Sequence, residues 1–363
     1  MKKIICLIML IVCSGCFFNS DNTAKENNYD IKDADAAYLY TGYNKKSKIL
    51  ITKENEVKDE IVIKRGYANG LNNLQYNSEL NNFYFTFVRH DKMESGLDEV
   101  AEVNASTKET TYIKFDDNDG IGDINDMLIA DNKIYVIGGF GKLARYDLIT
   151  KKKEYFSDKL SATNILCVYK DNIYTIVSDI SNENDIYHLV ELNFKTKKIK
   201  KIFSYSDENS IEDLCFLNNK IYFILSKFHW NKNDELIYDD AFLYNIDMKN
   251  NNTNFLKLKN KYAKEIINID NYLYISHYDE DFFDKNAISM FNIKTKKLKS
   301  ITTKESPIYI GAIKKDLISY EVKDYDNEGI YNIYNYKNLK KEGEYILNDD
   351  KNLFFRSFVE ITK

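Results

Sequence analysis

The chain has 363 residues and a formal net charge of −5 at pH 7, from 51 basic and 56 acidic side chains. This near balance excludes the strongly basic composition typical of nucleic-acid-binding proteins, so we expect no nucleic acid partner. Aromatic residues make up 14 % of the chain, with 29 tyrosines but one proline and 13 glycines. Such residues suit half-buried strands, and the abundant asparagines suit tight hairpins, so the composition favours an all-β fold.

The N-terminus reads as a targeting segment. Lys2 and Lys3 precede an apolar run at 4–12, and Cys13-Ser14-Gly15-Cys16 follows directly. The run is too short to span a bilayer, which takes about 20 residues, so we interpret residues 1–15 as a signal peptide. Small residues before a cysteine resemble the lipobox of bacterial lipoproteins, although Cys13 stands where that motif usually has leucine.

The lipobox resemblance implies that Cys16 is lipidated and becomes the new N-terminus. The protein would then be held on the extracytoplasmic side of the cell membrane of a bacterium, and the lysine-rich composition suggests an AT-rich genome. The alternative is an ordinary secretory peptide with a chance cysteine. Residues 16–32 are interpreted as the lipidated cysteine and a polar, flexible tether, and residues 33–363 as the folded domain.

A short motif recurs along the folded domain. Asn132-Lys133-Ile134-Tyr135 has close copies that end at Tyr174, Tyr222 and Tyr274, and looser copies at Tyr40, Tyr84 and Ile318. The copies are roughly 46 residues apart, a spacing typical of propeller blades. An apolar strand and a basic turn follow each copy, as in 291–297.

These repeats predict a seven-bladed β-propeller of four-stranded antiparallel blades. Each unit would hold an inner strand, a second strand with the Ile-Tyr pair, a third strand and an outer strand. The second strand is apolar at successive positions, as in 134–137, because neighbouring blades cover both of its faces. Six or eight blades would require a misread of the weak first or second unit.

The two ends of the domain are expected to close the ring. The first unit has strands such as 48–52 and 60–64 but no inner strand before them, and the last unit, with its outer strand at 344–347, leaves a surplus strand at 353–361. We expect this C-terminal strand to serve as the inner strand of the first blade and to protect the sheet edges.

Family features are sparse. The stretch 132–156, with Gly138-Gly139, resembles a Kelch blade, but the glycine pair does not recur, and the terminal Trp-Asp of WD repeats is missing. Over 33–363 the chain resembles a divergent bacterial propeller lipoprotein at the superfamily level. That resemblance implies the fold and no catalytic residue, and we expect no cofactor and no metal.

Propeller geometry separates two faces. The turns between inner and second strands, and between third and outer strands, share one side, which we call the turn face; it collects the lysines of 151–153, 195–201, 294–299 and 337–341. The opposite side, the loop face, collects the expected long loops 89–98, 178–185, 226–240, 276–286 and 323–329. We expect a basic turn face, in contact with solvent, membrane or wall polymer, and an acidic, aromatic loop face.

The loop face is the predicted binding surface, because loops on a rigid scaffold commonly carry recognition. The candidate residues are His229, Trp230, Tyr238, Asp239, Asp240, Tyr278, Asp279, Asp281, Phe282 and Phe283. The leading hypothesis is a monomeric, non-catalytic binding or scaffold module for a protein or glycan partner. The alternative is a hydrolase or lyase that acts on polysaccharide at the same face.

Other chemical signals are weak. His90, His229 and His277 fall in expected loops without metal-ligand spacing, and 116–120 lacks the alternation of a calcium loop. Cys167 and Cys215 occupy matching places on the inner strands of neighbouring units. We therefore expect free, buried thiols rather than a disulfide.

Overall fold

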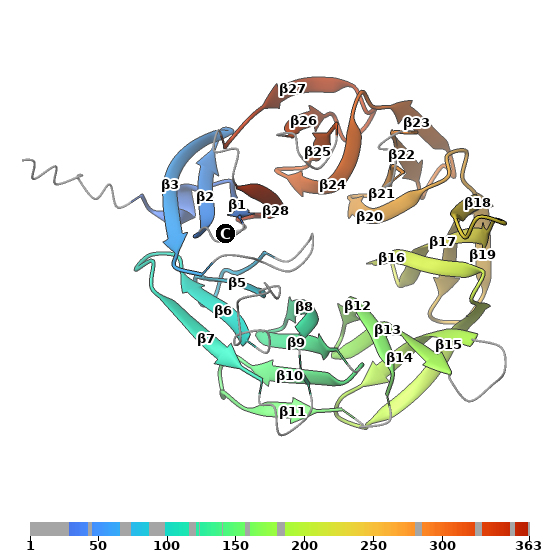
Figure 1. Cartoon of the computed structure of the whole chain (residues 1–363), viewed down its shortest axis with the longest axis horizontal. Coiled ribbons are helices and arrows are strands. Elements are labelled where there is room, and N and C mark those ends of the chain that lie inside the picture. Colours follow the sequence, from blue (N-terminus) through green and yellow to red (C-terminus); the bar gives the residue numbers. More distant parts are fainter. Residues whose placement is uncertain are drawn as a thin grey trace, which may run out of the picture.

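The computed structural model describes residues 29–42, 46–65, 74–86, 99–115, 121–122, 124–139, 141–156, 160–179, 186–279, 285–323, 329–348 and 353–361. Within these ranges, strands β1 to β28 form seven four-stranded antiparallel sheets arranged radially in a ring (Figure 1). The expected all-β, seven-bladed propeller is therefore confirmed. The predicted signal peptide and Cys16 lie outside the described residues. No helix within the described ranges is long and apolar enough to cross a membrane.

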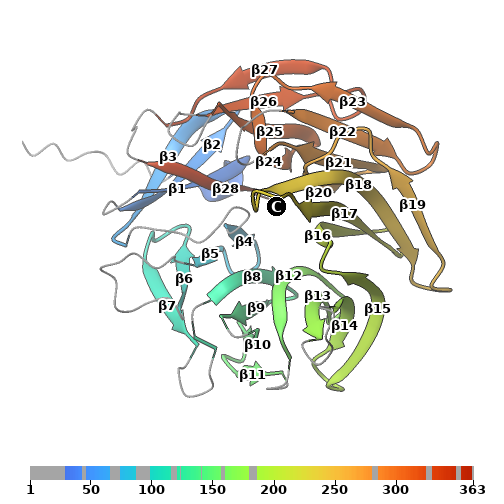
Figure 2. The same ribbon diagram turned by 45° about the vertical axis from the view of Figure 1, so that its right-hand side comes forward.

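Each blade runs from an inner strand at the centre of the ring to an outer strand at its rim, as Figure 2 also shows from an oblique angle. In order from inner to outer strand, the blades are: blade 1, β28 (Phe354–Glu360), β1 (Ala36–Thr41), β2 (Ser47–Lys53) and β3 (Glu56–Ile63); blade 2, β4 (Gln75–Asn77), β5 (Asn82–Thr86), β6 (Glu99–Asn104) and β7 (Thr110–Lys114); blade 3, β8 (Ile124–Ala130), β9 (Lys133–Gly138), β10 (Leu143–Asp147) and β11 (Lys153–Tyr155); blade 4, β12 (Ala162–Tyr169), β13 (Asn172–Asp179), β14 (Ile186–Asn193) and β15 (Lys198–Ser206); blade 5, β16 (Asn209–Leu217), β17 (Lys220–Trp230), β18 (Leu236–Asp247) and β19 (Thr253–Lys257); blade 6, β20 (Ala263–Ile269), β21 (Tyr272–His277), β22 (Ala287–Asn292) and β23 (Leu298–Thr302); and blade 7, β24 (Ser306–Ile313), β25 (Asp316–Val322), β26 (Ile330–Tyr334) and β27 (Lys341–Tyr345).

Blade 1 is built from both ends of the domain. A short 3-10 helix, η1 (Ile31–Asp33), leads into β1, and β28 pairs with β1 on its inner side (Figure 1). This is the closure that the surplus C-terminal strand led us to expect. The outer strand of blade 7 begins earlier than expected, at Lys341, because the preceding turn closes with an Asn335 N to Lys340 O bond.

Tight turns on the turn face explain why asparagine recurs between the strands of the repeats. Both central residues have positive φ at Asp131–Asn132, Lys170–Asp171 and Asn218–Asn219, which is the geometry of type I′ hairpins. In blades 2 to 7 the turns between third and outer strands instead begin with Asn or Asp, and in most of them its side chain accepts N–H bonds two or three residues on. Asn292 Oδ1, for example, accepts from Lys294 N and Thr295 N, both at 2.9 Å.

The recurring Ile-Tyr pair marks the second strand of a blade and supplies the core between blades. Tyr84, Tyr135, Tyr222 and Tyr274 are among the largest fully buried side chains. Their hydroxyl groups lie near the turn face, where Tyr84 Oη donates to Glu102 Oε1 (2.8 Å). The repeat motif is therefore a packing motif, and it does not form a binding site.

Side chains on the inner strands join successive blades around the central channel. Bulges interrupt the pairing in β16 and β20, so backbone groups there need other partners. Side-chain atoms of neighbouring blades accept backbone N–H groups in four such bonds: Asp213 Oδ2 from Ile266 N (2.9 Å), Glu265 Oε2 from Ile310 N (2.8 Å), Gln75 Oε1 from Ile129 N (2.6 Å) and Ser357 Oγ from Leu74 N (2.8 Å).

We expect Asp213 to make the stability of the ring depend on pH. Burial raises the pKa of Asp213 to about 7, against about 3.9 in an unfolded chain. The folded state therefore holds this proton more tightly, so the contribution to the free energy of unfolding is largest below about pH 4 and falls as pH rises to about 7, by at most about 4 kcal/mol. In Asp213→Asn we expect this fall to be absent. Urea unfolding of both proteins at acidic and at neutral pH measures the change in the free energy of unfolding. If this free energy changed with pH in the same way in both proteins, Asp213 would not be its cause.

Candidate functional site

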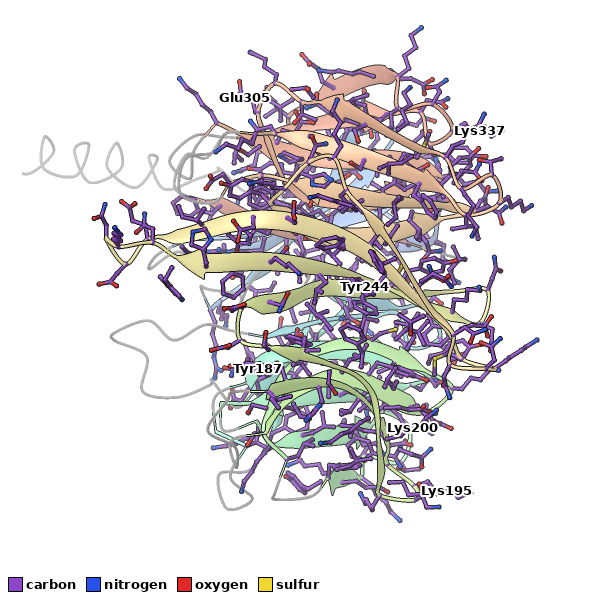
Figure 3. The ribbon with its side chains drawn as sticks, turned by 90° about the vertical axis from the view of Figure 1, so that its right-hand side faces the viewer. Tyr187, Lys195, Lys200, Tyr244, Glu305 and Lys337 are labelled. Atoms are coloured by element: carbon purple, nitrogen blue, oxygen red, sulfur yellow. The ribbon has the colours of Figure 1, made fainter. Side chains whose placement is uncertain are left out.

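The most prominent feature of the loop face is a hairpin formed by residues 227–240 of blade 5. Pairing of β17 with β16 stops at Lys227, and pairing of β18 with β19 stops at Phe242, whereas β17 and β18 stay paired as far as Trp230 and Leu236. A two-stranded ribbon therefore projects from the propeller, on the side away from Lys195 and Lys337 (Figure 3). The expectation of a long loop at 226–240 was wrong, because regular strand pairing continues to the tip.

The hairpin has two chemically different faces, because side chains alternate along each strand. Phe228 pairs with Tyr238, and Trp230 with Leu236, so these four side chains share one apolar face. The other face carries Ile237 and His229, whose Nδ1 lies 2.9 Å from Asp239 Oδ2. Trp230 is 64 % exposed and Ile237 36 %, so each face of the hairpin presents a large apolar side chain to solvent.

Contacts with blade 6 hold the base of the hairpin. The Tyr238 and Tyr262 rings are 5.0 Å apart, and Lys264 Nζ lies 5.0 Å from the centre of the Tyr238 ring. Lys261 Nζ donates to the Tyr238 carbonyl oxygen (3.0 Å). Trp230, by contrast, makes no ring contact or side-chain hydrogen bond within the described residues. The hairpin is thus held at its base by blade 6, and the Trp230 side chain near its tip has no ring or side-chain hydrogen-bond partner within the described residues.

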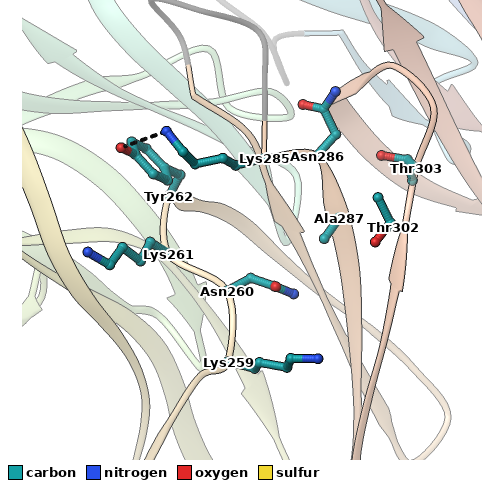
Figure 4. Close-up of a pocket in the computed structure, with 9 residues that line it drawn as sticks. All are labelled: Lys259, Asn260, Lys261, Tyr262, Lys285, Asn286, Ala287, Thr302 and Thr303. Atoms are coloured by element: carbon teal, nitrogen blue, oxygen red, sulfur yellow. Dashed lines mark hydrogen bonds between the residues drawn. The ribbon is translucent and has the colours of Figure 1, made fainter.

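A cavity of about 550 Å³ lies beside the base of the hairpin, on blade 6 (Figure 4). Its nine lining residues are Lys259, Asn260, Lys261, Tyr262, Lys285, Asn286, Ala287, Thr302 and Thr303. The Lys285 ammonium lies 4.9 Å from the centre of the Tyr262 ring and 3.6 Å from Asp279 Oδ2. Among the described residues, three lysines and no carboxylate line this cavity, so we call it the basic cavity. Much of the expected acidic character of the loop face falls on 280–284 and 324–328, which lie outside the described residues.

The structure separates the predicted site residues. His229, Trp230, Tyr238, Asp239 and Asp240 lie on the hairpin, where Asp240 pairs with Lys257 at 2.5 Å. Tyr278 is 5 % exposed and packs in the core between blades 7 and 1, and Asp279 is buried beside Lys285. Asp281, Phe282 and Phe283 lie outside the described residues.

His277, Cys167 and Cys215 lie inside the fold and are not presented as a site. His277 is fully buried, donates from Nδ1 to the Lys261 carbonyl oxygen (2.9 Å), and has its Nε2 2.9 Å from Ser289 Oγ. Burial lowers the pKa of His277 to about 4, so it is neutral at pH 7. Cys167 and Cys215 are free thiols, as expected, and burial raises the pKa of Cys167 to about 12. No cluster of metal-ligating side chains occurs among the described residues, and His90 lies outside them.

A second cavity, of about 360 Å³, contains the carboxylates most relevant to an enzyme. Glu305, Glu321 and Glu344 line it, and burial raises the pKa of Glu321. Glu321 is only 2 % exposed, however, and accepts a hydrogen bond from Tyr334 Oη (2.7 Å). This carboxylate is engaged within the fold, so it is not presented to a polymeric substrate.

Sequence reasoning missed Phe228, Ile237, Tyr262 and the lysines of blade 6 as parts of one surface. A signal for the hairpin was present: apolar residues alternate at Phe228 and Trp230 and again at Leu236 and Tyr238, around the turn-forming Asn231-Lys232-Asn233-Asp234. The approach of blade 6 to Tyr238 left no local signal, because it depends on the packing of two blades.

Comparisons with known proteins found structural likeness without a match in sequence. No family model matches the chain, and no curated protein matches it in sequence. A functionally unknown protein from Desulfotomaculum acetoxidans has a crystal structure that aligns with a TM-score of 0.52 and 9 % identity, over 89 % of this chain and 98 % of that one. The crystal structure of BamB from Moraxella catarrhalis aligns with a TM-score of 0.49 and 10 % identity, over 87 % of this chain and 91 % of that one. At such identities the likeness concerns the fold alone.

Proposed function

We propose that this chain is a membrane-anchored, extracytoplasmic lipoprotein whose propeller acts as a non-catalytic binding module. In this proposal the lipid on Cys16 holds the protein at the membrane, and the hairpin at 227–240 grips a protein partner. The proposal rests above all on the hairpin, because it carries an exposed tryptophan and is held at its base by the contact of Tyr238 with Tyr262. Tryptophan anchors of this kind carry much of the binding energy of protein interfaces.

The basic cavity beside the hairpin adds a chemical preference. Lys259, Lys261 and Lys285 line a hollow next to Tyr262, so an acidic segment of the partner fits there while an apolar segment covers Trp230. Tyrosine and tryptophan also stack on sugars, which makes an acidic glycan the alternative ligand. A polysaccharide hydrolase or lyase receives less support, because the candidate carboxylates Asp239, Asp240 and Asp279 each pair with a different basic side chain.

Shortening the hairpin tests this function. A variant in which 229–237 is replaced by an Asn-Gly turn is expected to lose crosslinking to its partner in intact cells while the seven blades stay folded, because the strand pairs of these residues lie within the hairpin and the contacts of Phe228 and Tyr238 with their neighbours remain. Affinity capture followed by mass spectrometry measures the loss. Equal capture by both proteins would contradict a hairpin-mediated contact, and capture of a glycan alone would favour the alternative ligand.

Lipidation is tested separately. With Cys16→Ala we expect the signal peptide to stay uncleaved and radiolabelled palmitate not to be incorporated, because the thiol is the acceptor of the lipid. Globomycin, which blocks lipoprotein signal peptidase, is expected to have the same effect on cleavage of the native chain. Normal processing in both cases would refute the lipoprotein assignment.

A further inference from the structure

The turn face carries a band of exposed lysines on its outer part, at the turns between third and outer strands. These side chains, which we call the lysine rim, are Lys151, Lys152, Lys153, Lys195, Lys197, Lys198, Lys294, Lys296, Lys297, Lys337 and Lys340. They come from blades 3, 4, 6 and 7, and Figure 3 shows Lys195 and Lys337 on the side opposite the hairpin. One edge of the propeller disc therefore presents positive charge from several blades at once.

The lysine rim lacks compensating carboxylates. None of its members forms an ion pair within the described residues. Lysines nearer the centre of the same face behave differently: Lys133 pairs with Asp171 (3.6 Å), Lys220 with Asp247 (3.4 Å) and Lys314 with Asp35 (2.6 Å). These three inner lysines are thus neutralised by carboxylates. The rim keeps its positive charge, and of its members Lys197 also donates from Nζ to the Tyr155 carbonyl oxygen (2.9 Å).

Turn geometry does not require these lysines. Lys151, Lys197 and Lys296 have φ near +60°, a backbone region that favours glycine or asparagine. The hydrogen bonds that close the turns come from the backbone and from Asp147, Asn193 and Asn292. Lysine at these positions is therefore locally unfavourable, and its repetition needs an explanation outside the turn.

The chain enters the propeller on the same face. Asp35, just before β1, accepts a bond from Glu54 N in the β2–β3 turn (2.8 Å) and pairs with Lys314 in the β24–β25 turn. Ile31 of η1 is buried in the core between blades 1 and 2. Residue 29, the first described residue, is thus held at the turn face, so a tether attached to Cys16 begins there.

We propose that the lysine rim lies against an anionic lipid surface, which orients the propeller with its hairpin directed away from the membrane. The proposal rests on the proposed lipid anchor, which would bring the turn face close to the bilayer. A lysine near an anionic leaflet contributes about 1 kcal/mol within a Debye length of about 10 Å, so a lipid and a basic surface act together. The aspartates around η1 carry negative charge and do not favour an anionic surface. The contact with lipid is therefore made by the lysine rim of blades 3, 4, 6 and 7.

Vesicle binding tests the surface without the anchor. The chain from Phe17 onward keeps every described strand, and it is sedimented with vesicles of phosphatidylcholine or of an equimolar phosphatidylcholine–phosphatidylglycerol mixture. We expect binding to the anionic vesicles alone, and binding at least about tenfold weaker after Lys195→Gln, Lys297→Gln and Lys340→Gln are combined. A matched variant with Lys46→Gln, Lys304→Gln and Lys323→Gln removes the same charge from the loop face, outside the hairpin and the cavity, and is expected to bind as the native chain does.

Trp230, the single tryptophan of the chain, reports orientation in the full-length lipidated protein. In anionic nanodiscs that contain a dansyl-labelled lipid, we expect weak energy transfer from Trp230 to dansyl, and stronger transfer in neutral discs or after the rim substitutions. Strong transfer in anionic discs would overturn the proposed orientation.

Two other outcomes of the vesicle experiment would overturn the proposal: equal loss of binding in the rim and control variants, and binding of soluble poly(glycerol phosphate) without binding of vesicles. The second result would identify a wall polymer as the partner. The vesicle experiment is independent of lipidation and of the hairpin, so a failure of the proposed function and a failure of this inference give different results.

Discussion

Phe358→Ala is expected to lower the free energy of unfolding by about 3–5 kcal/mol, the usual effect of removing a buried phenylalanine ring. Phe358 lies in β28, is buried, and has its ring centre 4.8 Å from that of Tyr309 and 5.3 Å from that of Tyr38. The ring also covers Gly311 so closely that a Cβ at that position would lie 2.4 Å from Phe358 Cζ. The variant therefore opens a cavity where the C-terminal strand closes the ring.

Phe255→Ala is the matched control, because Phe255 lies on the outer strand of blade 5 and is 64 % exposed. Its removal is expected to cost less than about 1 kcal/mol. Urea unfolding, followed by circular dichroism, compares the two variants. Since many small proteins are stable by only about 5–15 kcal/mol, the difference is large enough to measure. Equal destabilisation by the two substitutions would contradict the role assigned to the closure.

Trp230→Ala is expected to weaken partner binding by at least about thirtyfold, corresponding to the loss of about 2 kcal/mol or more at an interface anchor. Its unfolding free energy is expected to stay within about 0.5 kcal/mol of the native value, because the side chain is exposed and makes no ring contact within the described residues. Quantitative capture of the partner from cell extracts, with unfolding measured in parallel, separates binding from stability. Capture at native strength would remove Trp230 from the interface.

The fold could be predicted because its signals are local and repeated. Tyr84, Tyr135, Tyr222 and Tyr274 recur at blade spacing, and each is buried between blades, so the pattern reports packing directly. The position of the C-terminal strand was predictable as well, because the first unit lacked an inner strand and β28 fills that place beside β1. The reason for glycine at position 138 could not be predicted from the sequence. A Cβ there would collide with the backbone of Ile121, which approaches only in the folded chain.

The candidate site was less predictable, because it depends on contacts between blades. Trp230 and Asp239 were placed on the correct face, but their strand register and the His229–Asp239 bond required the structure. Tyr278 and Asp279 follow β21 directly, and the sequence pattern does not distinguish an exposed loop from the buried segment that the structure shows. The sequence does not distinguish the lysines of blade 6 from other surface lysines. They line a cavity because the fold brings 259–262 close to 285–287.

The proposed function depends on contact between the hairpin at 227–240 and a partner. Photocrosslinking in intact cells examines this contact at single positions, with a photoreactive amino acid placed at position 230 or at position 255 of the full-length protein. We expect a discrete crosslinked product from position 230 and none from position 255, which lies on the outer strand of the same blade. The same products from both positions, or a product from position 255 alone, would show that the hairpin is not the contact surface.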